Sequence, residues 1–259
     1  METANKNQLE LTKKYVRDIK SVNSWAVFKI LADFISGFDE LGELGPSVTV
    51  FGSARTDAKN KYYKKAEKLS RMLAKRGFNV LTGGGPGIME AANKGAYSVK
   101  NVESIGLNID LPMEQHANPY VTKEKTFDYF FSRKVMLVKY SMAYVIFPGG
   151  YGTLDELFEA LTLIQTRKIS GVRVFVVGEK FYKGLFKFIE KTLVPEGMID
   201  LEDFEMIMLS DNLSDIADEI EKSLGEQINV LREVGLSSTS YYKSLNEHFS
   251  DGKIIHTTE

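Results

Sequence analysis

Two glycine-rich turns contain the residues with the clearest chemical potential in this sequence. They span 83–87 (Gly-Gly-Gly-Pro-Gly) and 148–153 (Pro-Gly-Gly-Tyr-Gly-Thr), each between an apolar run typical of a strand and an amphipathic run typical of a helix. Such a turn exposes the unpaired N–H groups of a helix start, which favour phosphate. Two of them predict a phosphorylated ligand, and the alternative is a pair of tight turns that need positive φ. The candidate phosphate-binding residues are Gly84, Gly85, Gly149, Gly150, Gly152 and Thr153.

The second turn leads to a carboxylate, because Glu156 follows Thr153 by three residues. We expect Glu156 in the first turn of its helix, where the helix dipole favours the ionised form by about 0.3–1 kcal/mol. The resulting low pKa suits a base that orients water, or an anion that stabilises a cation, and it suits a general acid poorly. The same spacing is that of a capping box, in which Glu156 reaches back to the N–H of Thr153. One residue can serve both purposes.

Neither turn matches the common nucleotide-binding motifs. The dinucleotide fingerprint requires a third glycine where the first turn has Ile88, and a P-loop requires a Lys-Ser/Thr pair that both turns lack. The chain has no cysteine, and His116, His248 and His256 do not have the spacing of metal ligands. We therefore expect no bound NAD, no ATPase chemistry, no metal and no other cofactor.

Composition bounds the partners and the compartment. The chain has 259 residues, with 33 basic and 35 acidic side chains and a net charge of −2. This balance gives no basic excess that would indicate a nucleic-acid partner. No apolar run approaches the roughly 20 residues of a membrane span, and the N-terminus lacks the apolar core of a signal peptide. We expect a cytoplasmic protein with no nucleic-acid partner and no membrane partner.

The elements that must position the turns alternate between strand and helix patterns, which predicts a parallel sheet covered by helices on both faces. Ligands of such sheets bind beyond the carboxyl ends of the strands, where both turns and residues 52–55 are expected to lie. We expect one domain over 46–225, a helical N-terminal extension over 1–45 and a C-terminal extension over 226–259. The expected strands are 47–51, 79–82, 104–109, 143–147, 172–177 and 205–209. The expected helices include 59–75, 132–140, 181–192 and 213–224, together with one helix after each glycine turn and one that ends near residue 44. The segment 111–125 is expected to be a loop.

Residues 148–156 resemble the P-G-G-x-G-T-x-x-E signature of the LOG family, the cytokinin-activating phosphoribohydrolases long labelled lysine decarboxylases. Residues 83–90 are similar to the first glycine motif of that family, and 132–134 to its Arg-Lys pair. The resemblance covers 48–177, and the additional terminal segments resemble the longer bacterial branch. It implies a Rossmann-like, doubly wound sheet and a homodimer or a higher homo-oligomer.

The resemblance also implies a reaction, the hydrolysis of the N-glycosidic bond of a nucleoside 5′-monophosphate to free base and ribose 5-phosphate. It places the catalytic pair on Arg133 and Glu156. Ser53, Glu90 and Lys134 are further candidates for substrate contacts, and Glu90 is equally compatible with an ordinary polar helix position. The alternative function is a non-catalytic nucleotide- or cofactor-binding protein of the same superfamily, which would share the phosphate turns without using the catalytic pair.

The base of the substrate depends on whether the site has an apolar pocket. AMP needs none, and it is the expected substrate of a long bacterial-type member. A cytokinin riboside 5′-monophosphate would need space for its prenyl group. Phe127, Phe130 and Phe131 are candidates for lining such a pocket, although aromatic residues at this spacing more often belong to a core.

Overall fold

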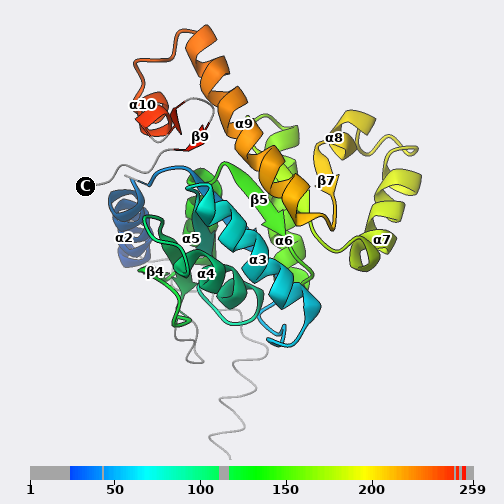
Figure 1. Cartoon of the computed structure of the whole chain (residues 1–259), viewed down its shortest axis with the longest axis horizontal. Helices are drawn as coiled ribbons and strands as arrows, with labels where there is room; N and C mark the ends of the chain where they lie inside the picture. Colours follow the sequence, from blue (N-terminus) through cyan, green and yellow to red (C-terminus); the bar gives the residue numbers. More distant parts are fainter. Residues whose placement is uncertain (1–23, 43, 111–116, 248, 251–252, 255–259) are drawn as a thin grey trace, which may run out of the picture.

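A computed structural model describes residues 24–42, 44–110, 117–247, 249–250 and 253–254 (Figure 1). Its centre is a seven-stranded, all-parallel sheet in the order β4-β3-β2-β1-β5-β6-β7. This arrangement confirms the predicted doubly wound α/β fold, in which the chain winds outward from β1 in both directions. The strands are β1 (Ser47–Phe51), β2 (Asn79–Thr82), β3 (Ser104–Ile109), β4 (Lys123–Phe127), β5 (Ala143–Ile146), β6 (Arg173–Val176) and β7 (Ile207–Leu209).

Helices cover both faces of the sheet. One face packs against α3 (Lys61–Lys75), α4 (Ile88–Tyr97) and α9 (Leu213–Glu233). The other packs against α5 (Phe130–Lys139), α6 (Tyr151–Gln165) and α7 (Glu179–Phe188). The remaining elements are α2 (Ser24–Leu41), the π-helical turn η1 (Ile189–Leu193), α8 (Leu201–Glu205), α10 (Ser240–Glu247) and an antiparallel pair, β8 (Phe249–Ser250) and β9 (Lys253–Ile254). In the described part of the chain, no helix combines the length and apolar character needed to cross a bilayer.

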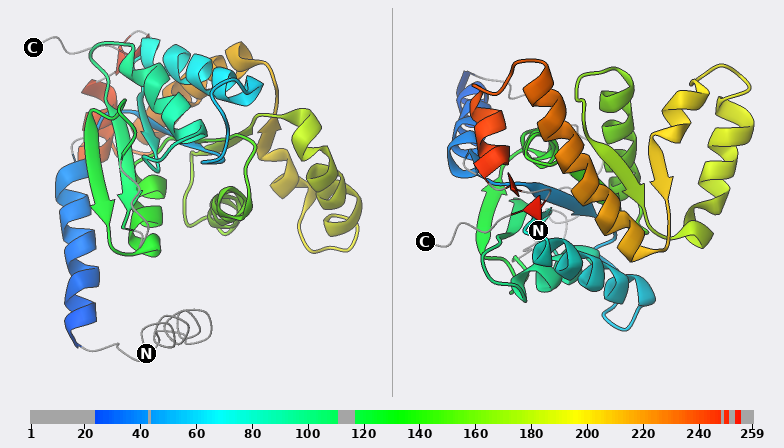
Figure 2. Two further views of the ribbon diagram at one scale, coloured as in Figure 1. Left: turned by 90° about the horizontal axis from the view of Figure 1, so that it is seen from below. Right: turned by 45° about the horizontal axis from the view of Figure 1, so that its top comes forward.

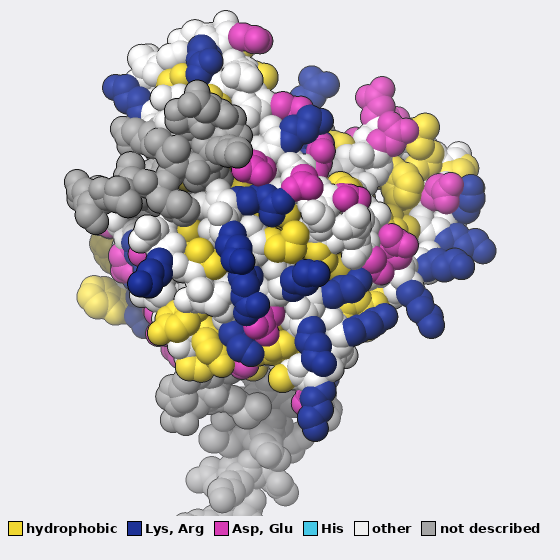
Figure 3. Space-filling model, viewed as in Figure 1, with side chains coloured by type: hydrophobic (Ala, Val, Ile, Leu, Met, Phe, Trp, Pro, Cys, Tyr) yellow, Lys and Arg dark blue, Asp and Glu magenta, His cyan; other side chains and the backbone are white. Residues whose placement is uncertain are grey.

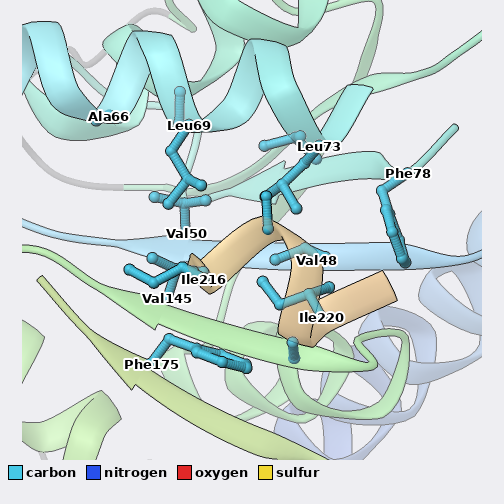
Figure 4. Packing of buried hydrophobic residues seen from close by; sticks show 14 of the residues in the cluster. Val48, Val50, Ala66, Leu69, Leu73, Phe78, Val145, Phe175, Ile216 and Ile220 are labelled. Atoms are coloured by element: carbon cyan, nitrogen blue, oxygen red, sulfur yellow. The ribbon is translucent and has the colours of Figure 1, made fainter. Parts of the chain in front are cut away.

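The core forms because successive strand residues point to opposite faces of the sheet. Val48 and Val50 of β1 face α3 and α9, whereas Phe51 faces the layer that contains α5 and α6. Figure 4 shows Leu69 and Leu73 of α3 meeting Ile216 and Ile220 of α9 above the valines of the central strands. The strands at the centre of the sheet are therefore buried on both sides, and the loops that follow them are held on a rigid frame.

Helix α3 illustrates how the sequence divides a helix between core and solvent. Its apolar residues recur at helical spacing and are buried, and Asn60 caps its start by accepting a hydrogen bond from Tyr62 N–H. Its opposite face is cationic, and Lys and Arg side chains line this side of the molecule in Figure 3. The helix contributes Lys61, Lys64, Lys65, Lys68, Arg71 and Lys75.

Two of the secondary-structure predictions made from the sequence are wrong. The segment 111–125, predicted as a loop, ends in strand β4. This strand is polar because it is an edge strand that pairs only with β3 and has mostly accessible side chains, so it lacks an apolar pattern. The helix predicted over 213–224 continues as α9 to Glu233, without a break at the expected domain boundary near 225. His116, His248 and His256, and most of the loop's first half, lie outside the described residues.

Helix α2 confirms the helical prediction from Ser24 to Leu41 and lies along one side of the molecule (Figure 2). Residues 1–23 of the predicted helical extension lie outside the described residues. The inward face of α2 reaches α5, where the rings of Phe34 and Phe131 lie 6.4 Å apart. Its outward face leaves large apolar side chains in solvent, with exposed fractions between 40% and 69%. This outward apolar stripe consists of Trp25, Phe28, Leu31, Ile35 and Phe38.

Candidate active site

The candidate site lies where the two halves of the sheet diverge. Strands β1 and β5 are neighbours, and the chain leaves their carboxyl ends in opposite directions, which is the usual ligand position in a doubly wound sheet. A cavity of about 660 Å³ opens at this point. It is lined by the loop after β1, by one residue from each side of the first glycine turn, by α5 and by the start of α6: Phe51, Gly52, Ser53, Ala54, Arg55, Gly83, Met89, Arg133, Gly150, Tyr151, Gly152, Thr153, Leu154 and Glu156.

The N-terminus of α6 opens into this cavity. The N–H of Leu154 donates to the C=O of Gly150, so the N–H groups of the three preceding residues have no acceptor within the helix. No described side chain caps this helix end, and around a Cβ placed at Gly150 or Gly152 no described atom lies within 4 Å. The second turn thus leaves its backbone donors accessible, as an anion site requires. Thr153 is buried beneath it, with its hydroxyl packed against Gly149.

The predicted capping box is absent, since α6 begins at Tyr151 and its first turn contains no acidic residue. Glu156 therefore lies in the second turn, too far along the helix to reach back to an unpaired N–H. The local pattern of Thr153 and Glu156 had allowed either role, and the structure leaves Glu156 free to face the cavity.

Glu156 and Arg133 form a largely buried pair. Glu156 Oε1 lies 3.9 Å from Arg133 Nη2, and their side chains are 17% and 12% exposed. Burial raises the pKa of the Glu156 carboxyl to about 7, an effect that Arg133 and then Lys134 partly offset, while Asp155 and Glu159 add to it. The expected low pKa of Glu156 is therefore wrong, because loss of water outweighs the helix dipole.

Arg133 has hydrogen-bond donors that Glu156 does not use. Burial lowers the pKa of its guanidinium, and Glu156 opposes this effect. The guanidinium lies 5.3 Å from the centre of the Phe130 ring. Its Nε is buried without a hydrogen-bond acceptor among the residues that the structure describes. At 3.9 Å the contact with Glu156 is an ion pair and not a hydrogen bond, so donors of Arg133 are available to a ligand.

The first glycine turn has a different role from the second. Gly84 has a φ of +72°, its N–H donates to Thr82 Oγ1, and its C=O accepts from the backbone and side-chain amides of Asn118. The C=O of Gly85 also accepts from Asn118. Both glycines are buried and neither lines the cavity, so the structure does not bring these two predicted phosphate ligands to the site. The turn supports the site by packing beneath it.

Three other candidate residues are placed differently from one another. Ser53 lines the cavity, and its hydroxyl accepts a hydrogen bond from Arg55 N–H at 3.1 Å. Glu90 lies outside the lining and accepts a hydrogen bond from Tyr63 OH at 2.7 Å. Lys134 also lies outside it.

Lys134 pairs with acidic side chains of α6 and does not line the cavity. Its ammonium pairs with Asp155 at 2.8 Å and with Glu159 at 2.7 Å. Burial lowers the pKa of Lys134, but the hydrogen bonds to these two carboxylates outweigh burial and leave the pKa raised. The two residues of the Arg-Lys pair therefore have different roles. Arg133 lines the cavity, and Lys134 forms ion pairs that connect α5 to α6.

The site includes residues that the sequence reasoning did not select. Tyr151 stands at the mouth of the cavity and is 95% exposed, an unusual state for an aromatic side chain. Its position between two glycines of the second turn was the available signal. Met89 also lines the cavity.

The sequence matches the family described as "possible lysine decarboxylase" over residues 89–220. The chain belongs to this family, which is the LOG family. It is 28% identical over 181 residues to the cytokinin riboside 5′-monophosphate phosphoribohydrolase LOG3 of Arabidopsis thaliana, covering 68% of this chain and 81% of that protein. It is also 28% identical over 177 residues to a probable enzyme of the same name, LOGL5 of Oryza sativa, covering 68% and 71%.

Solved structures share the fold of this LOG family member. The molybdenum cofactor carrier protein of Chlamydomonas reinhardtii superposes with a TM-score of 0.52 at 20% identity, covering 70% of this chain and 99% of that one. The molybdenum cofactor binding protein of Rippkaea orientalis gives a TM-score of 0.50 at 21% identity, covering 69% and 96%. At these identities the likeness shows the Rossmann-like architecture alone.

The second turn gives a matched pair of glycine substitutions. A Cβ at Gly149 would lie 2.1 Å from Thr153 Oγ1, whereas a Cβ at Gly150 meets no described atom within 4 Å. We expect Gly149→Ala to cost about 1–3 kcal/mol through overpacking, and Gly150→Ala to cost less than about 0.5 kcal/mol. Thermal unfolding of both variants measures the difference. Equal melting temperatures for the two variants would contradict the close contact between Thr153 and Gly149.

Proposed function

We propose that this protein hydrolyses the N-glycosidic bond of a nucleoside 5′-monophosphate and releases the free base and ribose 5-phosphate. The observation that carries the proposal is the buried pair of Glu156 and Arg133 in the same cavity as the uncapped N-terminus of α6. The first can act on a sugar and the second can bind a phosphate. Relatives named as cytokinin riboside 5′-monophosphate phosphoribohydrolases support the same reaction class.

In the proposed mechanism the phosphate accepts hydrogen bonds from the first N–H groups of α6, and the base points toward the mouth of the cavity. Breaking the bond between C1′ and the base nitrogen leaves an oxocarbenium-like sugar, which a nearby carboxylate stabilises. Glu156 accepts a proton from water as the water oxygen bonds to C1′. The departing base needs one proton, and a carboxyl with a pKa of about 7 can pass that proton on.

AMP is the proposed substrate. A prenylated adenine would need an apolar pocket, but Phe127 is fully buried in the core and neither Phe130 nor Phe131 is among the residues that line the cavity. Phe130 instead lies against Arg133. These three phenylalanines therefore do not provide a pocket for a prenyl group at the described cavity.

The direct test is to incubate the protein with AMP, and separately with the prenylated monophosphate, and to measure free base. We expect release of adenine from AMP, faster than release of the prenylated base. Glu156→Gln keeps the size of the side chain and removes the base, so kcat should fall at least about 100-fold. If neither substrate yields base above the Glu156→Gln variant, the protein is not this enzyme. Tight nucleotide binding without turnover would then support the binding-protein alternative.

The pH dependence of kcat/KM follows from the raised pKa of Glu156. A base must be ionised, so we expect the rate to rise with pH through about 7 and to fall below it. Arg133 lowers the pKa of Glu156, and Arg133→Gln should therefore move this limb to higher pH in whatever activity remains. The profile is measured between pH 5 and pH 9. A rate that decreases through pH 7 would instead show that Glu156 acts in its protonated form.

We also propose that the protein pairs with a second copy of itself through α2. The residues of the outward apolar stripe recur every three or four positions along α2, and a two-fold axis would place the stripe against its own equivalent. The resemblance to the LOG family implies a homodimer as well. Light scattering after gel filtration should therefore give about twice the 29.2 kDa of one chain, or a larger multiple.

Charged substitutions in the stripe test this surface. Trp25→Asp with Phe28→Asp should shift the protein toward the monomer because each would bury a carboxylate in the interface. Met198→Asp is the matched control, since Met198 is 67% exposed and lies between η1 and α8 in the sequence. Helix α8 is on the opposite side of the fold from α2 (Figure 1). A wild-type mass of one chain, or equal effects of both changes, would refute pairing through α2.

A further inference from the structure

A buried carboxylate on α2 reaches the start of α5. Asp33 is 8% exposed, and its oxygens accept hydrogen bonds from Asp128 N–H at 3.1 Å and from Tyr129 N–H at 3.1 Å. The hydroxyl of Ser132 lies 2.6 Å from the same carboxylate. The N–H of Tyr129, the N-cap residue, is one of the unpaired groups at the N-terminus of α5, and Asp128 lies just before the helix. The helix dipole also favours a negative charge at this place.

Helix α5 has no comparable cap of its own. Its N-cap residue is Tyr129, and this residue makes no side-chain hydrogen bond to the described helix start. Asp33 therefore holds the start of α5 from a helix far away in the sequence, by accepting from the N-cap residue Tyr129 and from the Ser132 hydroxyl. This contact gives the N-terminal helix α2 a specific structural role, which is to hold the start of α5.

Close packing near Asp33 holds α2 against α5. A Cβ at Gly37 would lie 2.9 Å from Met136 Cε and 3.1 Å from a ring atom of Phe127, so a larger residue would require these side chains to shift. The ion pair of Glu40 with Lys125, at 2.8 Å, joins α2 to strand β4 just before α5. Asp33 does not take part in this ion pair, which lies farther along α2.

Arg133 of the candidate active site comes directly after the residues at the start of α5 that Asp33 binds. Ser132 precedes Arg133, whose N–H donates to the C=O of Tyr129 at 3.2 Å. We infer that Asp33 is a positioning residue which, by holding the first turn of α5, fixes Arg133 opposite Glu156. This inference rests on the proposed function for its catalytic meaning, and on the contacts of Asp33 for its geometry.

Asp33→Asn is the variant that tests it, because asparagine keeps one acceptor oxygen and removes the charge. We expect kcat for AMP to fall by about 10-fold or more, as misplacement of a catalytic group does, with KM changed less than about twofold. The pKa of the Glu156 carboxyl, followed by carbon NMR, should rise because Arg133 and Lys134 on α5 no longer lower it as strongly. A residue that only stabilised the fold would lower the melting temperature without moving this titration.

Glu40→Gln is the matched control, since it breaks an α2 contact away from the start of α5. It should leave both kcat and the Glu156 titration at their wild-type values. Ser132→Ala removes one hydrogen bond to Asp33 and should give a smaller change in the same direction, which also decides the matter if Asp33→Asn does not fold. A folded Asp33→Asn variant with wild-type kcat and wild-type titration would overturn the inference. If the wild-type protein releases no base, the proposed function fails, and the titration alone still tests the positioning.

Discussion

Glu156 and Arg133 are both withdrawn from water, and either charge would be costly to bury alone. Their mutual attraction offsets part of that cost, yet at 3.9 Å they do not satisfy one another by a hydrogen bond. The pair is therefore incomplete in the described structure, with a carboxyl whose pKa is raised and a guanidinium that keeps free donors. A ligand with oxygen atoms would complete it. The rest of the fold can be understood as the frame that holds this pair at the point where the sheet divides.

The two glycine turns contribute to that frame in unequal ways. The second leaves its N–H groups open, because Gly150 and Gly152 carry no side chain that would cover the start of α6. The first is closed by Thr82 and Asn118, so its backbone groups are already satisfied. It is linked to the loop after β1, where the N–H of Ile88 donates to the C=O of Ser53, and Ser53 N–H donates in turn to the C=O of Pro148. The first turn thus supports the second turn, whose open N–H groups can bind an anion.

The sequence predicted the fold because its strands are apolar runs bounded by glycine and its helices have clear amphipathic spacing. It failed at β4, since an edge strand with accessible Lys and Glu side chains carries no apolar pattern. It located Arg133 and Glu156 through the family signature. It could not give the pKa of Glu156, because that value depends on burial by α5 and the β1 loop, which come from distant parts of the chain. The same limit applies to Gly84 and Lys134, whose partners Asn118, Asp155 and Glu159 become apparent only in three dimensions.

Helix α2 joins two features that the sequence kept separate. Its inward face holds the start of α5 through Asp33, and its outward face exposes the apolar stripe. In the proposed dimer a second copy would cover that stripe and restrict the motion of α2, which would in turn hold the start of α5 and Arg133. Binding linkage is reciprocal, so a ligand that prefers the fixed position of Arg133 must strengthen the pairing by the same factor by which pairing strengthens its own binding. In the proposed dimer, the assembly of this protein and the geometry of its site would then both depend on the packing of α2 against α5.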